Sequence, residues 1–267
     1  MSIETTSFAL SVSDAMDPAS VSERVSAIAD ISEHAGSLRY VCVRDDAMDP
    51  GFLREAVRIA AGSRLGVIVE SDVVSYIGTA VDGVPGADTI VCSQNGDQAG
   101  LSRLASERGL TVVISSPDIG DLMGLIAVAE GAGCRDIVLN PQVRSMKQCL
   151  ESTVAVRRLA LKEPSADRPI MVRAWSGEYA LAVASVSILR GGRLAVLDDL
   201  DPDGCRVLDE LINGFSRRGG HGRPFVHQER HGLLAGEAGL HRARGRLRGR
   251  GGSVGDRVHD VPRHGHP

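Results

Sequence analysis

The stretch that decides the fold reads FALSVSDAMDP at residues 8–18, and a similar stretch, YVCVRDDAMDP, follows at residues 40–50. In each copy an apolar extended run leads into Asp-Ala-Met-Asp-Pro, and an Asp-Pro pair is typical of the first turn of a helix. Asp14 and Asp46, which open the two copies, are 32 positions apart. That offset is about one strand–loop–helix–loop unit, so the sequence predicts a chain built from repeated β-then-α units.

The alternation of strand-like and helix-like segments continues to about residue 212. The strand-like runs are nearly continuous Val, Ile and Leu, which is typical of parallel strands covered on both faces. Eight such runs separated by helices favour a closed (β/α)8 TIM barrel. The rival architecture, an open doubly wound sheet, usually carries a glycine-rich phosphate turn after its first strand, and no such turn is present. The predicted strands are residues 8–13, 40–46, 65–71, 89–94, 110–116, 136–140, 169–174 and 193–199.

Several helix starts can also be predicted. Asp17 and Asp49 stand where N-caps belong, and Ser116-Pro117 and Asp201-Pro202 predict the same arrangement before the fifth and eighth helices. The sixth helix, at residues 144–162, is expected to be the longest. Its apolar stripe is expected to be core, and it comprises Met146, Cys149, Leu150, Thr153, Val154, Val156 and Leu161.

Composition limits the class of protein. The chain has 267 residues, of which 43% are apolar and 3% aromatic, so it can bury one large core or two small ones, built mainly from aliphatic side chains. Its five cysteines are scattered without a Cys-x-x-Cys pair, which indicates free thiols in a reducing compartment. We expect Cys42 and Cys92 to serve as packing residues, and no iron–sulfur cluster held by this chain alone.

A signal-peptide pattern is missing at residues 1–6, and the longest apolar stretch, residues 179–189, is too short to span a bilayer. We therefore expect a cytoplasmic protein with no membrane partner.

The chain divides into a predicted barrel domain, residues 1–214, and a low-complexity Arg/Gly/His-rich tail, residues 215–267. The tail contains 11 arginines and four acidic residues, a net charge of +7, whereas the first 214 residues carry −11. Three interpretations compete: a disordered basic arm, a His-rich metal tract, or an out-of-frame translation of a GC-rich gene. The last needs no functional assumption and is favoured over a specific nucleic-acid or metal role.

In barrels of this type the functional face is formed by the carboxyl ends of the strands. The polar side chains predicted there lack histidine, lysine and cysteine, which disfavours nucleophilic catalysis, and no spacing singles out a metal site. Asp and Asn at strand ends can hydrogen-bond a flat heterocycle such as a pterin, although Asp14 and Asp46 could equally only shape their loops. No catalytic residue is identified. The candidate substrate- or cofactor-facing residues are Asp14, Arg44, Asp45, Asp46, Glu70, Asn95, Asp118, Asn140, Arg173, Asp198 and Asp199.

Short segments in order along residues 7–212 resemble the corrinoid/iron–sulfur protein family, and in particular the barrel of its large subunit in the acetyl-CoA decarbonylase/synthase system. The segments that carry the resemblance are FALSVSD (8–14), VRD (43–45), SPDIGDL (116–122), DIVLNP (136–141), LEST (150–153) and RRLALK (157–162).

The resemblance implies a TIM barrel that works in one-carbon metabolism. Complexes of this family accept a methyl group from a tetrahydropterin onto cobalt and pass it to acetyl-CoA synthase. The implied partners are a related small barrel subunit, a methyltransferase and acetyl-CoA synthase, and the implied cofactor is a corrinoid (cobalamin). The chain departs from the family because it lacks the clustered cysteines of an N-terminal [4Fe–4S] domain, and its tail replaces a corrinoid-binding domain. We therefore expect the corrinoid to be bound through the complex and not by this chain alone.

Three functions remain open from the sequence. The first is the barrel component of a corrinoid-dependent methyl-transfer complex in the reductive acetyl-CoA pathway. The second is a stand-alone pterin-dependent methyltransferase, with Asn95, Asn140 and nearby aspartates holding the heterocycle. The third is a non-enzymatic scaffold or a truncated product, which the abrupt change of composition near Phe215 favours.

Overall fold

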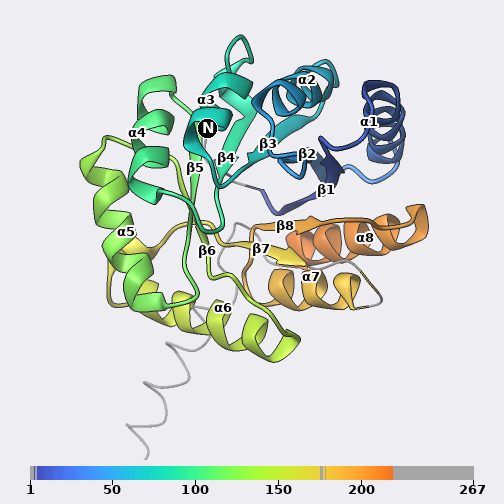
Figure 1. Ribbon diagram of the computed structural model, residues 1–267. Helices are drawn as coiled ribbons and strands as arrows, with labels where there is room; N and C mark the ends of the chain where they lie inside the picture. The colour runs from blue at the N-terminus through green and yellow to red at the C-terminus, as the bar shows by residue number, and fades with distance from the viewer. Residues whose placement is uncertain (1–2, 4, 175–176, 178, 219–267) are drawn as a thin grey trace, which may run out of the picture. The chain divides into compact units, whose positions relative to one another are not determined.

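The computed structural model describes residues 3, 5–174, 177 and 179–218. Within them, eight parallel strands alternate with eight helices, and the strands lie in the order β6-β5-β4-β3-β2-β1-β8-β7 (Figure 1). This arrangement confirms the predicted (β/α)8 barrel. Residues 219–267 lie outside the described part, so the interpretations of the tail stay predictions.

Every predicted strand is present, with ends up to two residues inside or outside the predicted ones. The one weak joint is between β6 and β7, where a single bridge pairs Leu139 with Ile170 and the Leu139 amide donates to the Pro169 carbonyl at 2.8 Å. We call this joint the seam. The strands are β1 (Ser7–Ser13), β2 (Leu38–Arg44), β3 (Gly66–Glu70), β4 (Thr89–Cys92), β5 (Thr111–Ser115), β6 (Ile137–Asn140), β7 (Met171–Ala174) and β8 (Leu194–Leu197).

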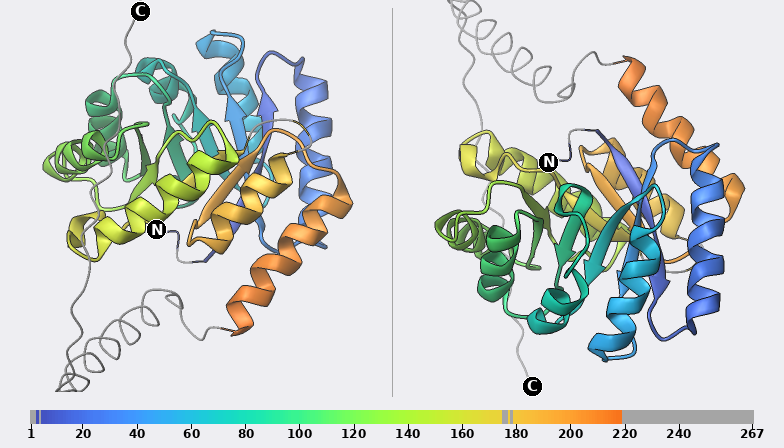
Figure 2. Two further views of the ribbon diagram at one scale, coloured as in Figure 1. Left: turned by 90° about the horizontal axis from the view of Figure 1, so that it is seen from below. Right: turned by 90° about the horizontal axis from the view of Figure 1, so that it is seen from above.

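The helices lie outside the strands and cover them, as the two views in Figure 2 show. Two short 3-10 turns, η1 (Gly86–Asp88) and η2 (Pro164–Ala166), precede β4 and β7. The helices are α1 (Pro18–Ser32), α2 (Pro50–Ala61), α3 (Val74–Ala80), α4 (Gln98–Arg108), α5 (Ile119–Gly131), α6 (Met146–Ala160), α7 (Ala180–Leu189) and α8 (Pro202–Arg218).

Three of the four predicted helix starts are correct. The carboxylates of Asp17 and Asp49 each accept hydrogen bonds from the second and third helical amides, and α8 begins at Pro202 directly after Asp201. The fourth was wrong: Asp118, not Ser116, caps α5. Ser116 is buried, and its Oγ accepts a hydrogen bond from the Asp118 amide at 3.1 Å, so it does not cap the helix. The cap is the carboxylate of Asp118, two residues later.

The predictions for α6 were partly wrong. It has 15 residues, as does α1, whereas α8 has 17. Cys149, Thr153 and Val156 are buried as expected, since they follow the i, i+4, i+7 spacing of one helix face. The rest of the predicted stripe turns outward, because one face of a helix can bury only a limited arc. Its most exposed members are Met146 (40%), Leu150 (36%) and Leu161 (42%).

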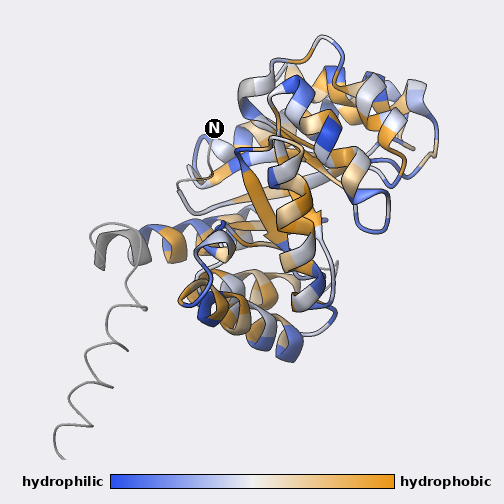
Figure 3. Cartoon of the chain, turned by 90° about the vertical axis from the view of Figure 1, so that its left-hand side faces the viewer, coloured by the Kyte–Doolittle hydropathy of each residue, from blue (hydrophilic) through white to orange (hydrophobic). Residues whose placement is uncertain are grey.

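The core has two parts, because successive strand side chains point to opposite faces of the sheet. One set lies between the strands and the helices, and the alternate set fills the barrel interior. Figure 3 shows the apolar strands between helices of mixed polarity. No helix of the described residues is long and apolar enough to cross a membrane. The interior set is Ile3, Ala9, Cys42, Ile68, Ile90, Cys92, Val113, Val138, Met171, Leu194 and Val196.

Candidate functional site at the carboxyl ends of the strands

Four charged side chains meet where the strands end, at what we call the mouth of the barrel. Arg44, Glu70 and Arg173 belong to β2, β3 and β7, and Asp198 follows β8. Each stands two residues beyond an interior apolar or thiol side chain, so strand alternation points it inward. Arg173 Nη1 donates to Glu70 Oε2, and Arg173 Nη2 donates to Asp198 Oδ1 at 2.8 Å. Arg44 Nη1 reaches the same Asp198 oxygen at 3.3 Å.

The charges of this cluster are matched within the cluster itself. Arg44 Nη2 also lies 3.0 Å from Asp46 Oδ2, so each guanidinium contacts two carboxylates. Burial raises the pKa of Glu70, and the guanidiniums of Arg173 and Arg44 oppose that shift without cancelling it. The charged side chains at the mouth therefore form an ion-pair network, and none of its carboxylates is left as a free base.

Amide and hydroxyl side chains occupy the opposite side of the mouth. Asn140, at the end of β6, donates from Nδ2 to Gln94 Oε1 at 3.1 Å and to Ser115 Oγ at 3.2 Å. Its Oδ1 accepts from the Gln142 amide at 3.1 Å, and the Gln142 side chain donates to the Gln94 carbonyl. Gln142 has a φ of 47°, a left-handed conformation rare for residues other than glycine. This amide cluster holds the loops after β4 and β6 together.

Two thiols lie beneath the charged cluster. Cys42 and Cys92 are fully buried in the interior apolar set, and burial raises the pKa of both thiols. They are therefore protonated and act as packing residues, as the sequence indicated.

The described residues do not fit an iron–sulfur cluster or an axial ligand to cobalt. All five cysteines are buried, two in the barrel interior and three between sheet and helices, and no group of three His, Cys, Asp or Glu residues in the described part could hold a metal ion. The one described histidine, His34, follows α1, where its Nδ1 lies 3.4 Å from the Asp30 carbonyl oxygen. The described part of the chain therefore offers no donor set for either group.

Of the candidate residues, Arg44, Glu70, Asn140, Arg173 and Asp198 gather at the mouth. Asp46 reaches the mouth only through its ion pair with Arg44. The remaining five have local structural partners, which are described next.

Asp14 is 1% exposed, and its Oδ1 accepts from the Asp46 and Ala47 amides, both at 2.8 Å. It thus shapes the loop after β2, which was the alternative interpretation of this residue. Asp45 Oδ2 accepts from Ser71 Oγ at 2.6 Å in the same manner. Both carboxylates tie neighbouring strand ends together.

Asn95, Asp118 and Asp199 point to other partners. The Asn95 side chain donates to Asp72 Oδ2 at 3.1 Å, and Asp118 caps α5 by accepting from the Asp121 amide. Asp199 forms an ion pair of 2.6 Å with Arg24 of α1. These three residues therefore stabilise loops and helices outside the mouth cluster.

Gln94 and Ser115 lie at the ends of the predicted strands 89–94 and 110–116, so their place at the mouth follows from the sequence. Two further residues of the site, Gln142 and Asp72, were not predicted. Asp72 Oδ1 accepts from Ser93 Oγ and from the Gln94 and Asn95 amides, at 2.8–2.9 Å. Nothing in the sequence marked Asp72 or Gln142, since both act through loop geometry.

Fold and site together define a (β/α)8 barrel protein with a hydrogen-bonded polar mouth. Similar solved barrels include dihydropteroate synthases from Thermus thermophilus (14% identity, TM-score 0.59, covering 81% of this chain and 96% of that one) and Xanthomonas albilineans (14%, 0.61, 82% and 95%). These likenesses show the fold. The chain belongs to the CO dehydrogenase/acetyl-CoA synthase delta subunit family, whose model matches residues 2–205.

A second relative connects the chain to the family suggested by its sequence segments. This chain is 24% identical over 164 residues to the corrinoid/iron-sulfur protein large subunit of Moorella thermoacetica. The match covers 59% of this chain and 37% of that protein. The chain is thus related to corrinoid-protein components of the acetyl-CoA pathway. The family model names a delta subunit, whereas the sequence segments had indicated the large subunit.

Proposed function

We propose that this chain is the barrel component of a corrinoid-dependent methyl-transfer complex, in which a methyl group passes from a methyltetrahydropterin through cobalt to acetyl-CoA synthase. The family match across the barrel supports a place in such a complex. One structural observation carries the division of labour: the ionisable side chains at the mouth are bound to one another, and no described group offers a metal a donor set.

The residues of the mouth therefore serve recognition in this proposal. A preformed network keeps its shape when another domain approaches, because its side chains are already fixed. We assign the cobalt chemistry to another component, because the described cysteines are buried and His34 follows the C-terminal end of α1, away from the mouth. The chain contributes a rigid polar surface rather than a reacting atom.

The test is reconstitution of the full chain with the related small barrel subunit and a corrinoid-carrying subunit of such a system. We expect one complex in size-exclusion chromatography with light scattering, with the visible absorbance of the corrinoid eluting in the same peak. Gln142→Arg, at the mouth, should weaken assembly, whereas Val207→Asp on α8 should not. Absence of a complex with the unmodified chain would reject the proposal.

A stand-alone pterin-dependent methyltransferase is the second candidate, and the amide cluster is the observation in its favour. One barrel of the same fold is a dihydropteroate synthase from Anaplasma phagocytophilum with bound 6-hydroxymethylpterin-monophosphate (12% identity, TM-score 0.58). Against it, both Nδ2 hydrogens of Asn140 are already donated within the cluster. Calorimetry and an activity assay with methyltetrahydrofolate test this candidate. If the full chain shows no heat of binding and no turnover, the candidate is excluded.

A further inference from the structure

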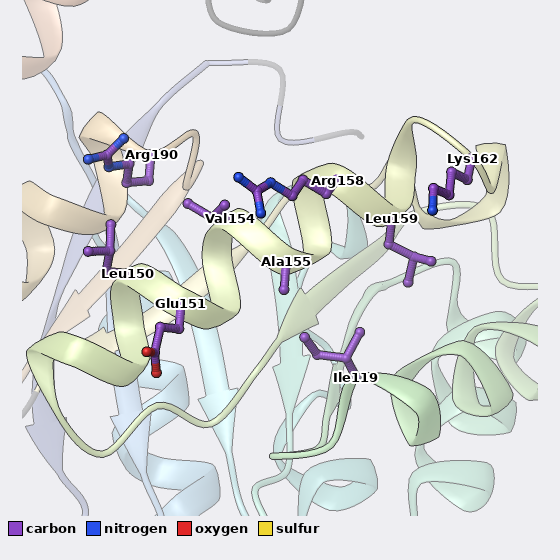
Figure 4. A pocket seen from close by; sticks show the side chains of 9 residues that line it. All are labelled: Ile119, Leu150, Glu151, Val154, Ala155, Arg158, Leu159, Lys162 and Arg190. Carbon is purple, nitrogen blue, oxygen red and sulfur yellow. The ribbon is translucent and has the colours of Figure 1, made fainter. Parts of the chain in front are cut away.

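The outer face of α6 is apolar over much of its length, although it lies on the outside of the barrel. Leu150 and Val154 follow one row along the helix, and Ala155 and Leu159 follow the next, with Ile119 of α5 beside them (Figure 4). Together they line a shallow hollow of about 660 Å³. We call this surface the α6 face. Leu150 is 36% exposed, and Val154, Ala155 and Leu159 are partly exposed, so the four side chains form one apolar patch at the surface. Contiguous apolar patches at a surface mark interaction sites.

Positive charge borders the α6 face. Arg158, Lys162 and Arg190 line the same hollow, and no ion pair joins any of them to another described residue. The single acidic side chain of the lining, Glu151, lies 3.9 Å from Lys147, which offsets its charge. This excess of cations contrasts with the first 214 residues as a whole, which carry a net charge of −11.

We propose that the α6 face docks an amphipathic helix of a partner protein, one whose apolar stripe is flanked by Asp or Glu. Leu150, Val154 and Leu159 span nine residues, or about 13.5 Å along the helix axis at ~1.5 Å per residue, so an incoming helix would cover them with anchors at about i, i+4 and i+8. The Asp or Glu side chains of the incoming helix then contact Arg158, Lys162 and Arg190. The inference does not depend on what the mouth of the barrel binds.

Charge also separates this occupant from the alternatives. The tail of this chain, residues 215–267, carries +7 and is repelled by the cations of the α6 face. A second copy of the chain brings the same cations with only the paired Glu151 to meet them. An acidic amphipathic helix is the occupant that matches both the apolar row and its border.

The experiment uses two fluorescent synthetic peptides of ~14 residues, about four helical turns, with the same leucine stripe. One carries Glu on its flanks and the other carries Lys. Fluorescence anisotropy with the full chain should show tighter binding of the Glu peptide. Leu150→Asp should weaken that binding about tenfold or more. The matched control is Val207→Asp, which alters another exposed apolar side chain, on α8, and should leave binding unchanged.

A charge exchange supplies the second variant. Arg158→Glu combined with Lys162→Glu should reverse the preference so that the Lys peptide binds more tightly, by about two- to fivefold. Thermal unfolding of each variant shows that the chain is folded. Equal binding of the two peptides, or equal loss in Leu150→Asp and Val207→Asp, would overturn the proposal. So would a dimer dispersed by Leu150→Asp in light scattering, or a cross-link between the α6 face and residues 219–267.

Discussion

Asp14 combines near-complete burial with incomplete hydrogen bonding. Its Oδ1 holds two loop amides, whereas its Oδ2 is buried without a hydrogen-bond partner among the described residues. Burial raises the pKa of this carboxyl above 3.8, and the two amides oppose the shift without overcoming it. The Asp14 side chain therefore stabilises the folded state most when it is protonated.

The sign of the pH dependence follows from that shift. Because the pKa is raised in the folded state, the contribution of Asp14 to stability is complete below pH 3.8 and is lost as the pH rises through the folded-state pKa. We expect the unfolding free energy of the unmodified chain, relative to that of Asp14→Asn, to fall as the pH rises from 3.8 through the folded-state pKa and then to stay constant. Urea titrations at several pH values measure this difference, and a rising difference would contradict the interpretation.

The ion pair between Glu70 and Arg173 is the second residue-scale prediction. Arg173→Leu removes the cation and leaves a buried carboxylate, which should lower the unfolding free energy by about 3 kcal/mol. The double variant Arg173→Leu with Glu70→Leu should recover much of that loss, since no unpaired charge remains. Denaturant unfolding measures Arg173→Leu, Glu70→Leu and the double variant, with Arg206→Leu on the exposed side of α8 as the control. A double variant as unstable as the sum of the single variants would refute the pairing.

Period-two alternation explains which candidate residues the sequence could place correctly. Arg44, Glu70, Asn140, Arg173 and Asp198 continue the inward phase of their strands and gather at the mouth. Asp118 and Asp199 also follow strand ends, but the chain has left the strand there and helix capping or an α1 ion pair decides their direction. From the second residue past the end of a strand, sequence periodicity no longer predicts the orientation of a side chain.

At the scale of elements, N-caps control where the helices begin. Asp17 Oδ1 accepts from the Ala19 and Ser20 amides at 3.0 and 3.1 Å, and these donors have no other partner in the first turn of the helix. We expect Asp17→Ala to lower the unfolding free energy measurably, because the Ala19 and Ser20 amides lose their acceptor. Glu23→Ala, on the exposed side of the same helix, is the control and should change it little. Equal effects of the two substitutions would show that charge, not capping, is responsible.

Capping chemistry was predictable where Asp directly preceded Pro, as at α1, α2 and α8. It failed at α5 because Ser116 and Asp118 both qualify as caps, and only burial of Ser116 decides between them. The α6 stripe failed for a related reason. Its apolar residues cover more than one helix face, and the sequence does not say which face meets the sheet.

At the scale of the whole molecule, the seam is where the barrel is least firmly closed. β1, β2 and β3 are joined by five or six paired residues at each junction, whereas β6 meets β7 at one bridge. Local opening requires fewer hydrogen bonds to break there. We expect the amides of Ile137–Asn140 to exchange with solvent deuterium faster than those of Gly66–Glu70. Equal protection of the two strands in hydrogen-exchange mass spectrometry would rule out a weak seam.

All five thiols are sequestered, so their reactivity would report how often the fold opens. Burial raises the pKa of Cys149 and Cys205 to about 11, and no described thiol is accessible to a reagent in the closed form. Modification by a thiol-directed label can therefore occur only during excursions that expose a given cysteine. Because two thiols lie inside the ring of strands and three lie under the helices, their labelling rates would report inner and outer loosening separately.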